Sequence, residues 1–270
     1  MDQRAVLAEY DQRMRKGAVA DGPGARVERL GGVVRQIGTE QGWSGVLWSG
    51  LDWDTADGDT ANGDTADAAI AEQIRYFTSL GREFEWKLYS HDRPTDLGER
   101  LRAAGFTSEP AETLMVAQVS ELPTDAELPD GLRLRPVVDA AGVDLVADVH
   151  EQVFGGGRPQ LRQRLLTQLT DAPDMVAVVV VMAGELPVCA ARLELYPGTG
   201  FAGLWGGGTL PDWRGRGIYR ALVAHRAKLA AERGYRYLQV DASDQSSPIL
   251  RRLGFLPLST TTPYLYRPHT

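Results

Sequence analysis

The chain has 270 residues, of which 43% are hydrophobic and 24% are charged. This is ordinary globular composition, and it excludes a wholly disordered, fibrous or collagen-like protein. The net charge of −7 argues against a general nucleic-acid-binding protein, because contacts with phosphates need a basic surface.

Cysteine content and hydropathy exclude further classes of protein. The single cysteine, Cys189, excludes an intrachain disulfide. No apolar stretch approaches the roughly 20 residues that a membrane span requires, and the N-terminus has no signal-peptide apolar region. We therefore expect a cytoplasmic protein that does not bind membranes.

The first half of the chain mixes strands and helices. Residues 5–15 predict a short helix, and two strand-like runs follow, interrupted by Gly31 and Gly32. A later stretch predicts helix, strand, helix and strand in turn, over residues 67–81, 83–91, 94–106 and 112–119. Gly105 closes the second of these helices.

Between these groups, residues 54–67 repeat Asp-Thr-Ala with a period of five residues. The aspartates suggest a calcium loop, but the ligand spacing and the Glu at position 12 of an EF-hand are missing. A solvated surface loop is the favoured interpretation.

Residues 121–131 contain two prolines and four acidic residues, without apolar periodicity. This composition predicts a linker between two domains, one over residues 1–122 and one over residues 131–270.

The second half repeats the same order of elements more clearly. Its predicted elements are a strand, two helices, three strands, a long helix, a strand, a short helix and a terminal strand. The first of the three strands, within residues 175–184, is almost continuous valine, which suits burial on both faces. Each half ends in strand, short helix, Gly-Phe and strand, which indicates a distant duplication.

The segment from Leu210 to Arg236 is the most informative. A turn containing Gly215 and Gly217 leads into the long helix, whose first N–H groups have no partner within the helix. Such a helix start binds phosphate or pyrophosphate. The segment 211–236 also has seven basic residues against two acidic ones, in an otherwise acidic chain.

Alternatives to a phosphate site remain at this point. The arginines can be a solvated helix surface, and the glycines can simply shape the turn. A Rossmann fingerprint is disfavoured because Arg220 occupies the place of the third glycine, and a Walker loop is excluded because no Gly-Lys-Ser/Thr follows.

The run TLPDWRGRGIYRALV, followed by YLQVD and SPILRRLGF, resembles the acyl-CoA-binding core of the GCN5-related N-acetyltransferases (GNAT). The family pattern Arg/Gln-x-x-Gly-x-Gly/Ala matches from Arg214 except at its last position, Tyr219. The resemblance implies an α/β fold of two tandem GNAT-like domains, each a mixed, mostly antiparallel sheet flanked by helices. The first domain would be a degenerate copy.

The resemblance also implies site residues. Acetyl-CoA or another acyl-CoA would be the co-substrate, without a metal. The pantetheine arm would pair with a strand that splays from its neighbour, with Gly206 to Gly208 favouring the break. A backbone N–H freed there would polarise the thioester carbonyl. The residues implied in coenzyme A binding are Gly207, Gly208, Thr209, Arg214, Gly215, Arg216, Gly217, Ile218, Tyr219 and Arg220.

The catalytic groups are less clearly marked. Where the family often has an acidic Tyr on the short helix, this chain has Leu250, so Tyr264 or Tyr266 on the last strand, or solvent, would protonate the thiolate. A base for an amine acceptor would be Glu194 or Asp241. Each also has a structural interpretation, Glu194 on a solvated strand face and Asp241 capping a turn.

The histidines and the cysteine give weaker evidence of a functional site. The four histidines are dispersed and predict no zinc site, His225 is expected to pack in the protein, and Cys189 is expected to be a buried small side chain. No Cys-His or Ser-His pairing is visible, which favours direct transfer without a covalent intermediate.

We therefore expect an N-acetyltransferase that acts on a small-molecule primary amine or a peptide N-terminus. The acidic surface favours a cationic acceptor, and internal pairing of the two domains favours a monomer over a dimer. The alternatives are an acyl-CoA-binding sensor or scaffold without turnover, and another acyl-CoA reaction such as decarboxylation.

Overall fold

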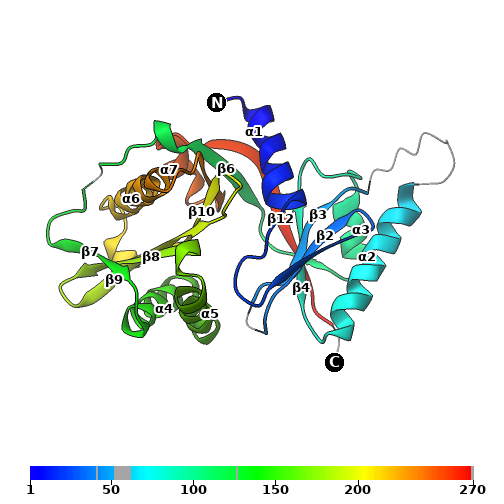
Figure 1. Cartoon of the computed structure of the whole chain (residues 1–270), viewed down its shortest axis with the longest axis horizontal. Helices are drawn as coiled ribbons and strands as arrows, with labels where there is room; N and C mark the ends of the chain where they lie inside the picture. Colours follow the sequence, from blue (N-terminus) through cyan, green and yellow to red (C-terminus); the bar gives the residue numbers. More distant parts are fainter. Residues whose placement is uncertain (41, 52–61, 126, 269–270) are drawn as a thin grey trace. The chain divides into compact units, whose positions relative to one another are not determined.

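A computed structural model of the chain describes residues 1–40, 42–51, 62–125 and 127–268 (Figure 1). The chain forms two compact units. The N-terminal unit comprises Asp2–Ala20, Gly24–Leu114 and Leu258–Thr270. The C-terminal unit comprises Met1, Asp21–Pro23 and Met115–Pro257.

The N-terminal unit is a sheet with helices. Its helices are α1 (Gln3–Tyr10), extended by a π-helical stretch over Asp11–Lys16, α2 (Asn62–Ser79) and α3 (Leu97–Ala103). Its strands are β1 (Arg26–Leu30), β2 (Val33–Ile37), β3 (Gly45–Ser49), β4 (Phe84–Tyr89), the short β5 (Thr107–Ser108) and β12 (Leu256–Tyr266). Gly31 and Gly32, at φ 54° and 79°, form the β1–β2 turn.

Strand pairing in this unit is mostly antiparallel. β1 pairs with β2, β2 with β3, and β12 with both β4 and β5, all antiparallel, whereas β3 and β4 are parallel. Helices α2 and α3 contribute Ile70, Phe77, Leu97 and Leu101 to a core that also contains Trp86 of β4.

The C-terminal unit has the same two classes of element. Its helices are α4 (Ala140–Phe154), α5 (Arg158–Asp171), α6 (Ile218–Glu232) and α7 (Ser247–Arg252), with short 3₁₀ turns over Val119–Glu121, Pro173–Met175 and Pro211–Trp213. Its strands are β6 (Glu112–Gln118), β7 (Leu132–Val137), β8 (Val176–Ala183), β9 (Leu186–Leu195), β10 (Phe201–Thr209) and β11 (Tyr237–Ala242).

The strands of the C-terminal unit lie in the order β6-β11-β10-β9-β8-β7. Helices α4 and α5 cover one face of this sheet and α6 and α7 cover the other (Figure 1). The valine-rich strand β8 lies between them, with Val178 and Val180 packed toward α4 and α5, and Val179 and Val181 packed toward α6. The predicted burial of this strand on both faces is confirmed.

The two units share a topological pattern that supports duplication. In each, a parallel strand pair is connected through a long helix, β3 to β4 through α2 and β10 to β11 through α6. The short helices α3 and α7 then end in the same way, with Phe106 N–H bonded to Leu101 O and Phe255 N–H bonded to Leu250 O. Gly105 and Gly254 close these turns at φ 96° and 100°. The predicted fold class of two tandem α/β domains is confirmed.

The strand that ends each half of the sequence belongs mainly to the unit formed by the other half. Most of β6, which ends the first half, belongs to the C-terminal unit, and β12, which ends the second half, belongs almost entirely to the N-terminal unit. The domain limits 1–122 and 131–270 stay a prediction.

The Asp-Thr-Ala repeat is only partly visible. Residues 54–61 lie outside the described residues, whereas α2 begins at Asn62 and so includes the last part of the repeat. The helix therefore begins five residues before the predicted start at residue 67. No helix in the described part of the chain is long and apolar enough to cross a bilayer.

Burial of β8 on both faces can be tested with single valine truncations. Val180→Ala and Val181→Ala, on opposite faces and both fully buried, should each lower the free energy of unfolding by about 1.5–3 kcal/mol. Val138→Ala, at a position that is 79% exposed, should change it by less than about 0.5 kcal/mol. Urea unfolding measures all three, and a small effect at either buried valine would show that one face of the strand is not core.

Candidate functional site

The turn before α6 has the backbone of an anion site. Gly215 and Gly217 have φ values of 74° and 85°, in the left-handed region that favours glycine. Gly217 is the N-cap, and the first intrahelical bond runs from Ala221 N–H to its carbonyl oxygen. The N–H groups of Ile218, Tyr219 and Arg220 therefore lie at the open end of the helix, with no side-chain cap. A Cβ at Gly215 would meet no atom within 4 Å, so this backbone is open to a ligand.

The arginines of the turn line this opening. Arg214 donates from Nε to Thr209 O, and Arg216 donates from Nη2 to Asp212 O, each at 3.0 Å. The Arg216 guanidinium also lies over the Trp213 ring. Arg220 is exposed on the first turn of α6. The three arginines keep positive charge beside unpartnered N–H groups, an arrangement that attracts phosphate.

Tyr219 turns away from the opening. Its side chain packs against the core cluster under α6, and its ring lies 3.2 Å from the position that a Cβ of Gly207 would take. Burial raises the pKa of the Tyr219 phenol, opposed by the nearby charge of Arg226. Tyr219, where the resembled family has Gly or Ala, therefore packs into the protein and leaves the turn over residues 214–217 clear. We call this turn, with the first residues of α6, the phosphate turn.

Strand β10 leaves its parallel neighbour early. It pairs with β11 only from Phe201 to Gly203, whose partner is Gln239, although β10 continues to Thr209 and β11 to Ala242. Between Trp205 and Gly208 the pairing with β9 also shifts by one residue, and Gly206 has φ 57° there. The splayed strand that the sequence predicts is present, and Gly207, Gly208 and Thr209 lie on it.

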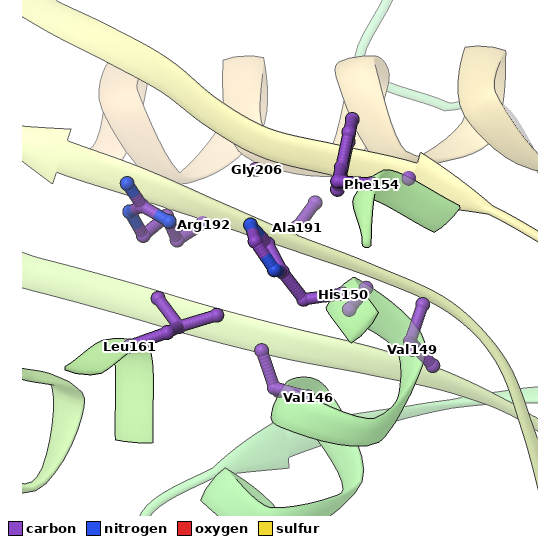
Figure 2. Close-up of a pocket in the computed structure, with 10 residues that line it drawn as sticks. Val146, Val149, His150, Phe154, Leu161, Ala191, Arg192 and Gly206 are labelled. Carbon is purple, nitrogen blue, oxygen red and sulfur yellow. The ribbon is translucent and has the colours of Figure 1, made fainter. Parts of the chain in front are cut away.

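A pocket opens beside this part of β10, on the face covered by α4 (Figure 2). It is a shallow depression, and the roughly 260 Å³ of space around it includes open solvent. We call it the α4 pocket, and its lining residues are Val146, Val149, His150, Phe154, Leu161, Ala190, Ala191, Arg192, Gly206 and Gly208. The lining is mostly apolar, with one imidazole and one guanidinium.

Glu194 is buried next to the α4 pocket. Its Oε1 accepts hydrogen bonds from Arg192 Nε at 2.9 Å and Arg164 Nη2 at 3.4 Å, and its Oε2 accepts one from the Tyr196 hydroxyl at 3.1 Å. Burial alone raises the pKa of Glu194, but the charges of the two arginines and the hydrogen bonds from Arg192 and Tyr196 together lower it. The interpretation of Glu194 as part of a solvated strand face does not agree with its 5% exposure.

The other two predicted catalytic residues lie in different surroundings. Asp241 lies on β11 two residues beyond the last pair with β10, and strand alternation places it on the face opposite the α6 core. Tyr264, by contrast, is 3% exposed and belongs to the core of the N-terminal unit. Leu250 is fully buried in the α6 core. Nothing in these surroundings gives Tyr264 access to a substrate.

Cys189 and Ser259 are the two potential nucleophiles whose surroundings bear on a covalent mechanism. Cys189 is buried, and burial raises the pKa of its thiol. A Ser-His pair that is not visible in the sequence does occur in the fold, because His91 Nδ1 lies 2.8 Å from Ser259 Oγ and His91 Nε2 lies 2.9 Å from Asp11 Oδ2. This chain of hydrogen bonds joins β12 to the rest of the N-terminal unit, whereas the phosphate turn belongs to the C-terminal unit.

One buried cation and one imidazole nitrogen were missed by sequence reasoning. Arg226 on α6 is 1% exposed, and its Nη2 has no hydrogen-bond partner among the described residues. His150 Nδ1 is likewise buried without such a partner. The signal for His150 was its place four residues after Val146 and four before Phe154, on the apolar face of α4. Nowhere in the described residues do three His, Cys, Asp or Glu side chains form a group that could hold a metal ion.

Comparisons with known proteins agree with this geometry. Residues 144–255 match the family model described as "Acetyltransferase (GNAT) family". No curated protein matches the chain.

Solved structures share the fold over almost the whole chain. A GCN5-related N-acetyltransferase from Kribbella flavida is 19% identical, with a TM-score of 0.68, over 98% of this chain and 95% of that one. One from Sphaerobacter thermophilus is 17% identical, with a TM-score of 0.60, over 91% and 77%. A tandem GNAT protein from the clavulanic acid biosynthesis pathway is 12% identical, with a TM-score of 0.62, over 92% and 86%.

The buried carboxylate of Glu194 should contribute measurably to stability. Glu194→Gln leaves Arg192 without its charge partner and leaves Arg164 paired only with Asp21, and we expect it to lower the free energy of unfolding by about 1–3 kcal/mol. Glu185→Gln is the control, because Glu185 forms an ion pair with Arg133 at a side chain that is 97% exposed.

The pH dependence of the free energy of unfolding tests whether the charged form of Glu194 stabilises the fold. Because the folded-state pKa of Glu194 is lowered, its stabilisation is fully present above the ordinary glutamate pKa of about 4.3 and is lost as the pH falls through the folded value. The stability difference between wild type and Glu194→Gln should therefore be constant above about pH 5 and shrink in acid. A difference that grows in acid would contradict the assignment.

Proposed function

We propose that the protein is an N-acyltransferase, because residues 144–255 match the model of the acetyltransferase (GNAT) family, whose co-substrate is acetyl-CoA. It would move an acetyl group from acetyl-CoA directly to a primary amine. The observation that carries this proposal is the juxtaposition of an open helix N-terminus with the strand segment of β10 that has left β11.

The phosphate turn would hold coenzyme A. The N–H groups of Ile218, Tyr219 and Arg220 would bind the pyrophosphate, assisted by the helix dipole. Gly215 and Gly217 would let the phosphates approach the backbone, and Arg214, Arg216 and Arg220 would add positive charge around them.

The pantetheine arm would pair with β10 from Gly207 to Thr209. The edge of this strand that faces β11 has no strand partner beyond Gly203, so its backbone groups can pair with the amides of pantetheine. Arg226 lies under the same segment, with Nη2 3.9 Å from the position that a Cβ of Gly207 would take. Its charge would stabilise negative charge on the thioester oxygen during transfer.

Direct transfer agrees with the state of the thiol. Cys189 is buried with a raised pKa, which disfavours the reactive thiolate. The amine would instead attack the thioester from the α4 pocket, which borders the same glycines of β10. Asp241 at the edge of the gap, and Arg192 held by Glu194, would shape the acceptor side. Since Tyr264 is buried in the other unit's core, we leave it out of this mechanism.

The acceptor is proposed only as a class. A small-molecule amine or a peptide N-terminus would enter the α4 pocket, and neither nucleic acid nor a membrane has a place in the proposal. We also propose that the chain acts in the cytoplasm, as a monomer whose two tandem units form one working protein.

Substitutions in the phosphate turn test coenzyme A binding. Gly215→Leu and Gly217→Leu should each weaken binding of coenzyme A at least about tenfold by calorimetry, because a side chain strains the left-handed backbone and blocks the anion. Gly184→Leu, at φ 59° in the β8–β9 turn, imposes similar strain away from the site and should leave binding unchanged. Equal binding by all three variants would contradict the assigned turn.

Turnover separates this function from the alternatives. Wild-type protein supplied with acetyl-CoA and a panel of primary amines should release free thiol and form an amide. Tight coenzyme A binding without turnover across the panel would instead favour a sensor or scaffold. Release of carbon dioxide from a malonyl thioester would favour a decarboxylase.

A further inference from the structure

Direct transfer needs a proton acceptor beside the attacking nitrogen. A primary amine is mostly an ammonium ion at neutral pH, and its nitrogen becomes strongly acidic once it bonds to the carbonyl carbon. Glu194 is a poor acceptor, because both of its oxygens already accept hydrogen bonds and its pKa is lowered. Another group on the same face of the sheet suits the task better.

His150 lies in the α4 pocket itself. Figure 2 shows its imidazole rising from α4 toward β9, between Arg192 and Phe154. The imidazole shares the pocket lining with Gly206 and Gly208, which lie on the segment of β10 proposed to bind the pantetheine arm. Arg192 Nη1 lies 2.8 Å from the position that a Cβ of Gly206 would take, and the Phe154 ring lies 2.9 Å from that of Gly208, so these two side chains flank the approach from the imidazole to that segment.

The hydrogen bonding of His150 leaves one nitrogen available. Nδ1 is buried and has no partner among the described residues. The backbone of Gly156 hydrogen-bonds the ring and by itself raises its pKa, as a carbonyl oxygen facing a ring N–H would. We infer that this bond occupies Nε2, which places the proton of the neutral ring there and leaves the lone pair on Nδ1.

The surroundings keep this imidazole neutral. Burial lowers the pKa of His150, and the charge of Arg192 lowers it further. Arg192 comes from β9, whereas α5 contributes the apolar Leu161 and β10 contributes only glycines to the lining. No carboxylate lines the pocket, although Glu194 beside it pairs with Arg192 Nε at 2.9 Å.

We propose that His150 is the catalytic base of acyl transfer, accepting through Nδ1 the proton of a primary amine whose apolar arm fills the α4 pocket. The proposal rests on the acyltransferase function proposed above. The arm would contact Val146, Val149 and Leu161, and it would cover Phe154, which is 54% exposed. A polyamine suits this lining less well, because no carboxylate in the lining would pair with its further cations.

The proposed step balances in bonds and protons. The amine nitrogen forms a bond to the carbonyl carbon, and the bond from that carbon to sulfur breaks. One proton passes from the nitrogen to His150 Nδ1, and the imidazolium returns it to the thiolate of coenzyme A. The products are an amide and the free thiol.

His150→Gln tests the base, with His225→Gln as the matched control. His225 is a half-buried histidine of α6, whose pKa burial also lowers, but it lies outside the α4 pocket. With acetyl-CoA and 2-phenylethylamine, His150→Gln should lower kcat at least about 100-fold, as measured by thiol release. Binding of coenzyme A by calorimetry should stay within about twofold of wild type, and His225→Gln should keep wild-type activity.

The pH profile supplies a readout that a structural role would not move. At saturating amine, the kcat of wild type should fall in acid with an apparent pKa below the ordinary histidine value of about 6.5, and this acidic limb should vanish in His150→Gln. Free imidazole should restore part of the activity of His150→Gly. Partial rescue by free imidazole would also show that the variant is folded, because an unfolded variant could not be rescued.

The possible outcomes separate the two proposals. Loss of thiol release by wild type with every amine would overturn the acyltransferase function and this inference together. If wild type is active and His150→Gln keeps its rate and its acidic limb, only the role of His150 is overturned. The same holds if the acidic limb is lost in Asp241→Asn and kept in His150→Gln. A kcat/KM for spermidine equal to that for 2-phenylethylamine would overturn the apolar acceptor class, where we expect at least a tenfold preference for the aromatic amine.

Discussion

The separation of β10 from β11 after Gly203 is the constraint on which the site depends. Two parallel strands that stay paired along their full length would satisfy each other's backbone groups and leave nothing for a ligand. Here the pairing ends at Gly203 and Gln239 while both strands continue. The helix that follows β10 begins with its own unpartnered N–H groups. Under the proposed function, one short stretch of chain would therefore offer backbone hydrogen bonds to both parts of a nucleotide-linked thioester.

Glycine lets side chains pack closely against this stretch from both faces of the sheet. A Cβ at Gly207 would approach Tyr219 and Arg226 on the α6 side, whereas a Cβ at Gly208 would come within 2.9 Å of Phe154 on the α4 side. The α6 side supplies a buried positive charge, and the α4 side supplies an apolar pocket with a neutral imidazole. The two sides thus suit different tasks, stabilising charge on the thioester oxygen and receiving the amine.

Sequence reasoning recovered the parts of the structure that depend on local pattern. The valine run of β8, the Gly-Phe ends of α3 and α7, and the glycine turn before α6 each follow from nearby residues. It did not find that β6 and β12 end in each other's units, because pairing between distant strands leaves no local signal. For the same reason, only part of the candidate site could be predicted from the sequence. The inward turn of Tyr219, the arginines around Glu194 and the free nitrogen of His150 all depend on contacts between segments far apart in the sequence.

The backbone amides of the turn provide the most direct test of the central claim. In ¹H–¹⁵N spectra of the full chain titrated with coenzyme A, the account predicts large shifts for Gly217, Ile218, Tyr219 and Arg220, with smaller shifts along β10 from Gly207 to Thr209. Resonances of the N-terminal core, such as Trp86 and Phe77, should stay in place. Saturable coenzyme A binding that leaves the four turn amides unmoved would contradict the account.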